Sequence, residues 1–169
     1  EALGALVGPL EGIVGHSLGG TATALALGQG LLTARRAALV APALSPWLFS
    51  WHFARMIGLP KTRVPGMIAR TELLVGATAD TLDAGAAVRH LATPAYLVHD
   101  PEDLDVPFEH ATGLAAAWPG ATLVPRPGLG HRRILQDAET VAGVVGFVGG
   151  KLGGAEGAAG AQVERMQRI

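Results

Sequence analysis

The five residues Gly15-His16-Ser17-Leu18-Gly19 constrain the fold of this chain more than any other stretch. They have the form Gly-x-Ser-x-Gly, and they stand between a short apolar run and a helical pattern rich in small residues. A strand that turns sharply into a helix strains the backbone of the residue at the turn. Since glycine has no Cβ atom, we expect the two outer glycines to avoid collisions there. The stretch therefore predicts that Ser17 lies at a sharp strand-to-helix turn, with its hydroxyl projecting from the end of the strand.

The rest of the sequence alternates short apolar runs with helical periodicity. The expected strands are residues 10–15, 37–41, 94–99 and 121–125. The expected helices are residues 1–7, 18–31, 47–57, 65–75, 80–91, 107–118 and 133–148. Such alternation is typical of an α/β domain, and continuous apolar strands indicate a sheet covered on both faces. The sequence therefore predicts a doubly wound, mostly parallel sheet.

One connection in this pattern is unusually long. Residues 43–93 separate the second and third expected strands, and several prolines interrupt them. We interpret this segment as an inserted helical cap. Residues 151–169 are rich in Gly and Ala and lack apolar periodicity, which is typical of a flexible tail. We therefore expect one partial domain at residues 1–150, followed by that tail.

Composition argues against several classes of function. The net charge is −1 and charged residues make up 16% of the chain, so no nucleic-acid partner is expected. The absence of cysteine excludes disulfides and thiolate metal sites. No His, Asp and Glu residues show metal-ligand spacing, so we expect neither a metal nor another cofactor. No apolar run approaches the roughly 18 residues that span a bilayer, and no signal peptide is visible, which favours a cytoplasmic location. Nothing in the sequence indicates an oligomeric state.

Three polar residues, Ser17, Asp103 and His131, each follow the end of an expected strand. Because parallel strands end at one edge of a sheet, their side chains are expected near one another, where ligands of such domains bind. A serine hydroxyl becomes a nucleophile when a histidine takes its proton and a carboxylate orients that histidine. His131 is the candidate base. The candidate acids share one loop and are Asp100, Glu102, Asp103 and Asp105.

Three motifs follow one another along the chain. They are Gly15-His16-Ser17-Leu18-Gly19-Gly20, then His99-Asp100-Pro101-Glu102-Asp103 followed by Val106-Pro107, and finally Gly128-Leu129-Gly130-His131. In this order they resemble the C-terminal portion of an α/β-hydrolase-fold serine hydrolase of the esterase or lipase kind, over residues 10–150. The resemblance implies that the acid stands three positions before the Val-Pro pair, which selects Asp103, with Asp100 as the alternative. It also implies further N-terminal strands before the serine turn, and a loop with a second oxyanion donor, which this chain lacks.

The resemblance implies cleavage of a carboxylic ester, or of a related acyl bond in a small molecule, through an acyl-enzyme on Ser17. His131 is then the base, and the backbone N–H of Leu18 is an oxyanion donor. Three aromatic residues of the cap either line the substrate pocket or pack inside the cap, namely Trp47, Phe49 and Trp51. Two alternatives are a non-catalytic fragment or binding scaffold that keeps the triad residues, and an acyltransferase with the same triad.

Three further features have simpler interpretations. His16 adjoins the serine and is expected to pack beside it, and His99 ends a buried strand and is expected in the core. The run Gly128-Leu129-Gly130 resembles part of a phosphate-binding loop, but no Lys-Ser or Lys-Thr pair follows it. We therefore expect no phosphate site there.

Overall fold

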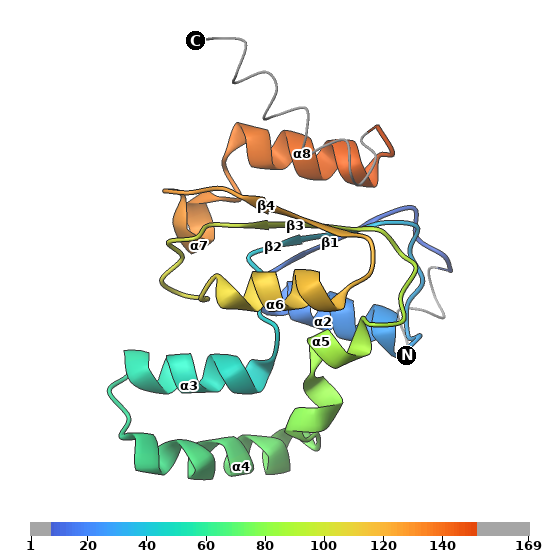
Figure 1. The fold of residues 1–169 in the computed structure, drawn as a ribbon. Coiled ribbons are helices and arrows are strands. Elements are labelled where there is room, and N and C mark those ends of the chain that lie inside the picture. The colour runs from blue at the N-terminus through green and yellow to red at the C-terminus, as the bar shows by residue number, and fades with distance from the viewer. Residues whose placement is uncertain (1–7, 152–169) are drawn as a thin grey trace.

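Four parallel strands form a single sheet in the order β1-β2-β3-β4 in the computed structural model, which describes residues 8–151 (Figure 1). The strands are β1 (Ile13–His16), β2 (Ala37–Val40), β3 (Ala95–His99) and β4 (Ala121–Pro125). All four expected strands are present, and their pairing confirms the parallel sheet. Because they run in the same direction, the loops that follow β1, β3 and β4 leave the sheet at the same edge.

Helices cover both faces of this sheet, as the doubly wound arrangement predicts. The α-helices are α2 (Leu18–Gly28), α3 (Pro46–Met56), α4 (Val64–Val75), α5 (Ala84–Ala87), α6 (Glu109–Ala117), α7 (Gly130–Arg133) and α8 (Ala138–Val148), and the 3₁₀ helices are η1 (Lys61–Arg63) and η2 (Ala79–Leu82). Helices α2, α5 and α6 lie on one face, and α8 lies on the other (Figure 1).

The two central strands are buried on both faces. In β2, Ala37 and Leu39 pack in a cluster with side chains of α2 and α6, while Ala38 and Val40 pack with side chains of α8. Successive side chains of a strand point to opposite faces, so an uninterrupted apolar run supplies both clusters. All five residues of β3 are buried as well. The sheet is therefore a rigid base for the loops at its carboxyl edge.

The segment between β2 and β3 is helical, and α3 and α4 lie beyond the layer that α2, α5 and α6 form (Figure 1). The boundaries of a cap at 43–93 stay a prediction. The single helix expected at 80–91 is wrong, because η2 and α5 occupy this stretch. Asp83 separates them with an extended backbone, and its carboxylate accepts the N–H of Ala86 at 3.1 Å. This side-chain cap starts a new helix at that point.

Two expectations near the C-terminus need correction. The helix expected at 133–148 begins only at Ala138, because Asp137 caps it by accepting the N–H and the hydroxyl of Thr140 at 2.8 and 2.7 Å. The loop expected at 128–131 contains the start of α7. The helix expected at 1–7, and the tail beyond residue 151, lie outside the described residues. Among the described helices, none has the length and apolar character to cross a membrane.

The glycines around Ser17 differ in how tightly they are enclosed. A Cβ atom on Gly15 would lie 2.7 Å from the Cα of Gly20 and 2.8 Å from the carbonyl oxygen of Gly19. A Cβ atom on Gly20 would lie 3.1 Å from the Cβ of Pro42. A Cβ atom on Gly19 would meet nothing within 4 Å in the part of the chain described. The expected collision is therefore confirmed at Gly15. It is wrong at Gly19, and Gly20 is the closely packed glycine on the helix side of the turn.

We predict that Gly15→Ala lowers the free energy of unfolding by about 1–3 kcal/mol, because the methyl group would overpack the turn against backbone atoms. Gly19→Ala is the matched control, and it should be neutral or stabilising by up to about 1 kcal/mol, since alanine favours the helix. Urea unfolding followed by circular dichroism measures both. Equal effects of the two substitutions would contradict this account of the turn.

Candidate active site

Ser17 stands at a strained turn between β1 and α2. Its backbone has φ 53° and ψ −126°, in the region that L-residues rarely adopt. Its N–H donates to the carbonyl of Val40 at 3.0 Å, which continues the pairing of β1 with β2. Its carbonyl accepts the N–H groups of Gly20 and Thr21 at 3.0 and 3.2 Å, which starts α2. The expected sharp turn at Ser17 is therefore confirmed, at a strain of about 1–3 kcal/mol.

A chain of hydrogen bonds joins Ser17, His131 and Asp103. Ser17 Oγ lies 2.9 Å from His131 Nε2, and His131 Nδ1 lies 2.7 Å from Asp103 Oδ2. A carboxylate can only accept, so the proton belongs on Nδ1, and Nε2 then accepts the serine hydroxyl. The three residues are far apart in sequence and meet because each follows a strand of the same sheet.

The Asp103 carboxylate is buried, and hydrogen-bond donors surround it. Its Oδ1 accepts the backbone N–H groups of Asp105 at 2.8 Å and Val106 at 2.9 Å. Burial alone would raise the pKa of Asp103. The hydrogen bonds from His131, His99 and Val106, with the charge of His131, outweigh burial and hold this pKa well below its usual range. Asp103 is therefore ionised at neutral pH.

His99 approaches the same Asp103 oxygen as His131 does, and it is fully buried. Its Nε2 is 3.0 Å from the carbonyl oxygen of Val106 and 3.4 Å from Asp103 Oδ2. Its Nδ1 has no hydrogen-bond partner among the described residues, and its ring meets Phe108 edge-on with centroids 5.7 Å apart. The expected core position is confirmed, and the contact with Asp103 is a feature that the sequence did not reveal.

His16 contacts both the backbone carbonyl and the ring of His131. Its Nε2 lies 3.0 Å from the carbonyl oxygen of His131, and the two rings are 4.8 Å apart. Burial is the main cause that lowers the pKa of His16, helped by the neighbouring histidines and opposed by this hydrogen bond. His16 is therefore neutral at pH 7, and its Nε2–H donates to the carbonyl. The expected packing beside Ser17 includes a polar contact that holds His131.

Among the described residues, Asp100, the alternative acid, makes no hydrogen bond to the His131 ring. Its Oδ1 accepts the N–H groups of Glu102 at 2.8 Å and Gly128 at 3.3 Å, and its Oδ2 accepts the N–H of Gly130. Of the two candidate acids, Asp103 is the one that bonds to His131 Nδ1.

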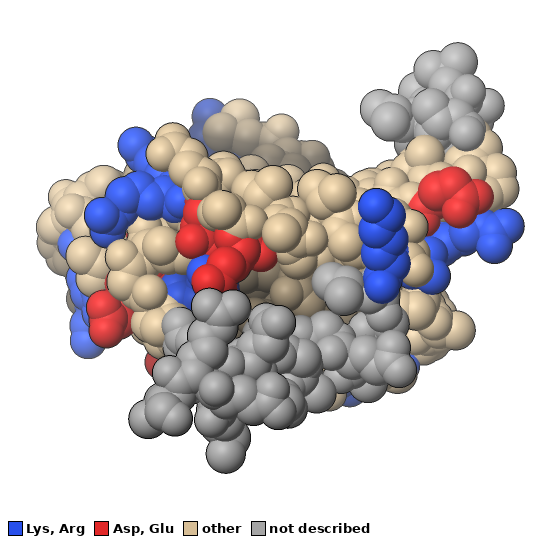
Figure 2. Space-filling view, turned by 90° about the horizontal axis from the view of Figure 1, so that it is seen from above, with Lys and Arg blue, Asp and Glu red and all other residues tan. Residues whose placement is uncertain are grey.

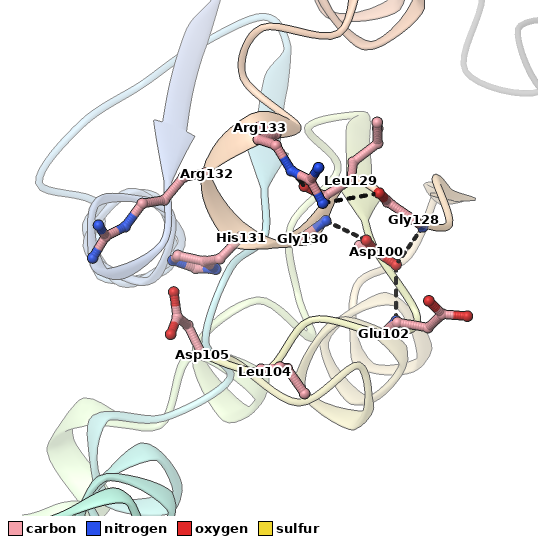
Figure 3. Close-up of a pocket in the computed structure, with 10 residues that line it drawn as sticks. All are labelled: Asp100, Glu102, Leu104, Asp105, Gly128, Leu129, Gly130, His131, Arg132 and Arg133. Atoms are coloured by element: carbon pink, nitrogen blue, oxygen red, sulfur yellow. Dashed lines mark hydrogen bonds between the residues drawn. The ribbon is translucent and has the colours of Figure 1, made fainter.

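The loops that carry Asp103 and His131 enclose an open hollow of about 530 Å³ (Figure 3). It is lined by Asp100, Glu102, Leu104, Asp105, Gly128, Leu129, Gly130, His131, Arg132 and Arg133. Acidic and basic side chains both line it, and they are also interspersed on the face of the molecule shown in Figure 2. No continuous field of one sign is visible on that face.

The three cap aromatics occupy different environments. Trp47 is buried, with 7% of its surface exposed. Phe49 is half-buried and stacks on Phe53, with centroids 6.4 Å apart. Trp51 is 46% exposed and lines a second hollow of about 630 Å³ beside η1. Neither hollow is lined both by these aromatics and by His131, so a role in substrate binding stays a prediction.

The backbone N–H of Leu18 lies in the first turn of α2, next to Ser17. No carbonyl of the helix can accept an N–H in this position. Together with the positive end of the helix dipole, it favours an anion beside Ser17. The role of this N–H as an oxyanion donor stays a prediction.

One group of side chains has the spacing of a metal site in space, although not in sequence. Ligand atoms of Asp103, Asp105 and His131 lie within 4.8 Å of one another. A cation there would compete with the His131–Asp103 hydrogen bond and with the two backbone N–H groups that Asp103 accepts. The expectation of no metal stays a prediction.

No protein-family model matches the chain, and a comparison with curated proteins gives no match either. Several solved structures do match. An α/β fold family hydrolase from Bacillus anthracis has a TM-score of 0.60 at 13% identity, over 83% of this chain and 66% of its own. The esterase domain of a Rhodothermus marinus protein has a TM-score of 0.58 at 21% identity, over 89% of this chain and 62% of its own. MGS-M2, an α/β hydrolase enzyme from a deep-sea metagenome library, has a TM-score of 0.55 at 22% identity, over 82% and 64%.

These similarities show that the chain has the α/β-hydrolase fold. The chain spans less than two thirds of the length of the Rhodothermus and metagenomic structures, and just under two thirds of the length of the Bacillus hydrolase. Identities below 25% support the fold alone, and a shared fold does not determine activity.

We predict that acid destabilises the protein in part through Asp103. A carboxyl whose pKa is depressed in the folded state stabilises the fold above its unfolded pKa of about 3.9, and this stabilisation is lost as the pH falls further. Urea unfolding at about pH 5 and about pH 3 should therefore show a smaller loss of stability in Asp103→Asn than in wild type. Glu102→Gln, which removes an exposed carboxylate from the same loop, should keep the wild-type loss. An identical loss in Asp103→Asn and wild type would contradict this assignment.

Proposed function

We propose that this chain carries the catalytic residues of a serine hydrolase that cleaves a carboxylic ester or a related acyl bond of a small molecule. The observation that carries the proposal is the hydrogen-bonded chain Ser17–His131–Asp103, with Ser17 at a strained turn. Strain at the serine keeps its hydroxyl at the sheet edge, and the buried carboxylate fixes the imidazole tautomer.

In the first half of the reaction, Ser17 Oγ attacks the acyl carbon while its proton passes to His131 Nε2. The imidazolium that forms is stabilised by the ionised Asp103, which stays deprotonated. The tetrahedral intermediate collapses when the bond to the leaving group breaks, and His131 Nε2 gives its proton to the departing alcohol. An ester of Ser17 remains.

In the second half, water attacks this ester as His131 Nε2 takes one of its protons. The second tetrahedral intermediate releases the carboxylic acid and returns the proton to Ser17 Oγ. The N–H of Leu18 donates to the oxyanion in both halves. Loss of one such donor typically costs about 10²–10³-fold in rate, so a second donor would add greatly to turnover. The family resemblance assigns such a donor to a loop that precedes the serine turn.

We predict that a fluorophosphonate probe labels Ser17, since the probe needs an activated serine and not a complete turnover. Ser17→Ala should abolish labelling, and His131→Gln should slow it on the order of 10⁴-fold. Ser50→Ala is the matched control, because Ser50 bonds to the carbonyl of Pro46 in the cap, and it should label like wild type. Intact-protein mass spectrometry followed by peptide mapping measures all four proteins.

Two results would refute the proposal. An unlabelled wild-type protein would favour a non-catalytic scaffold that keeps the triad residues. Equal labelling of Ser17→Ala and wild type would place the reactive group elsewhere. If labelling occurs, adding an alcohol acceptor to an activated ester distinguishes hydrolysis from acyl transfer, because a transferase forms the new ester in preference to the acid.

A further inference from the structure

The loop before His131 has the shape of an anion-binding site. Gly128 and Gly130 both have left-handed backbones, with φ 81° and 66°. When left-handed and right-handed residues alternate along a backbone, neighbouring N–H groups point to one side and form a concave nest for an anion. This is the run whose sequence resembles part of a phosphate-binding loop, and it lies on the wall of the hollow in Figure 3.

The anion in this nest is a side chain of the same molecule. Asp100 accepts N–H groups from Gly128 and Gly130, and a third from Glu102 (Figure 3). Asp100 is 1% exposed, and no salt bridge to it occurs among the described residues. Burial would raise the pKa of Asp100, but the N–H groups of Gly130, Glu102, Leu129 and Gly128 together lower it. Backbone donors therefore keep a buried carboxylate ionised.

The carbonyl groups of the same loop also have a partner. The Arg133 guanidinium donates to the carbonyls of Leu129 at 3.0 Å and Gly128 at 3.3 Å. Asp100 thus binds the N–H side of the loop and Arg133 binds its carbonyl side (Figure 3). Arg133 is exposed and Asp100 is buried, so the Asp100 carboxylate has less freedom to move than the Arg133 guanidinium.

The hydrogen bonds of Asp100 and Arg133 restrain the loop up to Gly130, the residue before His131. Gly130 donates to Asp100, and the carbonyl of His131 accepts from His16 at 3.0 Å. The backbone at the imidazole is therefore bound to Asp100, which directly follows β3, and to His16, the last residue of β1. The ring must meet Ser17 Oγ at 2.9 Å and Asp103 Oδ2 at 2.7 Å together, which leaves little freedom for its backbone.

We propose that Asp100 is a positioning residue, the internal anion of the Gly128–Gly130 nest that fixes His131 between Asp103 and Ser17. This inference rests on the proposed function. A neutral side chain cannot fill the same place, because asparagine would turn an NH₂ donor toward one of the N–H groups that now meet a carboxylate oxygen. Asp100 bonds to backbone N–H groups and to neither Ser17 nor the His131 ring, so its loss should affect the maximal rate and not binding of the probe.

The first test is fluorophosphonate labelling of Asp100→Asn at a series of probe concentrations. We expect the maximal labelling rate to fall about 10- to 100-fold, as for a displaced catalytic group, with the half-saturating probe concentration unchanged. Glu102→Gln is the matched control, because it removes a carboxylate from the same loop and keeps the backbone N–H that Asp100 accepts. A wild-type maximal rate in Asp100→Asn overturns the inference, and so does a change confined to the half-saturating concentration.

The second test is chemical rescue of Asp100→Ala. Formate has the two acceptor oxygens of the missing carboxylate, so it should raise the labelling rate of this variant several-fold and leave wild type unchanged. Formamide is the neutral control and should have no effect. A general loss of structure would not be repaired by formate, so the absence of rescue in a folded variant overturns the inference.

A measurement on the unmodified protein covers the case in which both variants fail to fold. Amide chemical shifts of Gly128 and Gly130 should stay constant as the pH falls through the usual aspartate range near about 4, because their bound carboxylate resists protonation. Shifts that titrate in that range would overturn the inference. Failure of wild-type labelling would instead refute the proposed hydrolase, so the two failures can be told apart.

Discussion

The hydrogen bond between the His131 ring and the buried Asp103 carboxylate depends on the whole parallel sheet. Asp103 is ionised in a buried place because backbone N–H groups and two histidines surround it. The backbone donors lie in the loop after β3, and His99 is the last residue of β3, while His131 lies in α7 after β4. A parallel sheet places both loops at one edge, and the hydrophobic clusters on its two faces hold the strands in register.

Ser17 directly follows β1 and lies at the same edge of the sheet as His131 and Asp103. Its strained backbone persists because close packing on both sides determines it, with Gly15 against Gly20 and the N–H of Ser17 on the carbonyl of Val40. Strain, a buried charge and a buried histidine nitrogen are all costly features. They lie together in one small region. Departures from preferred local structure are expected mainly at functional sites.

Much of the site was evident from the sequence, because strand ends can be recognised from apolar runs. Strand ends predict Ser17, His131 and the acidic loop at one edge, and the family resemblance selects Asp103 from that loop. The structure brings the three side chains within hydrogen-bond distance. Helix boundaries were less predictable. Asp83 and Asp137 each start a helix by accepting a backbone N–H, and such short-range caps override the apolar periodicity that suggested longer helices.

The order of strands and helices, the turn at Ser17 and the kinds of side chain at the sheet edge all follow from the apolar runs and motifs of the amino-acid sequence. The tertiary structure decided which carboxylate meets His131 and what the others do. Asp100 and Asp103 are three residues apart in one acidic loop, and only the family resemblance, through the Val106-Pro107 pair, favours Asp103 as the partner of His131. Their roles differ because Asp100 faces the N–H groups of a loop whose left-handed glycines shape it, while Asp103 faces the His131 ring. Such contacts depend on the path of the backbone in space, which is set only when the strands pair.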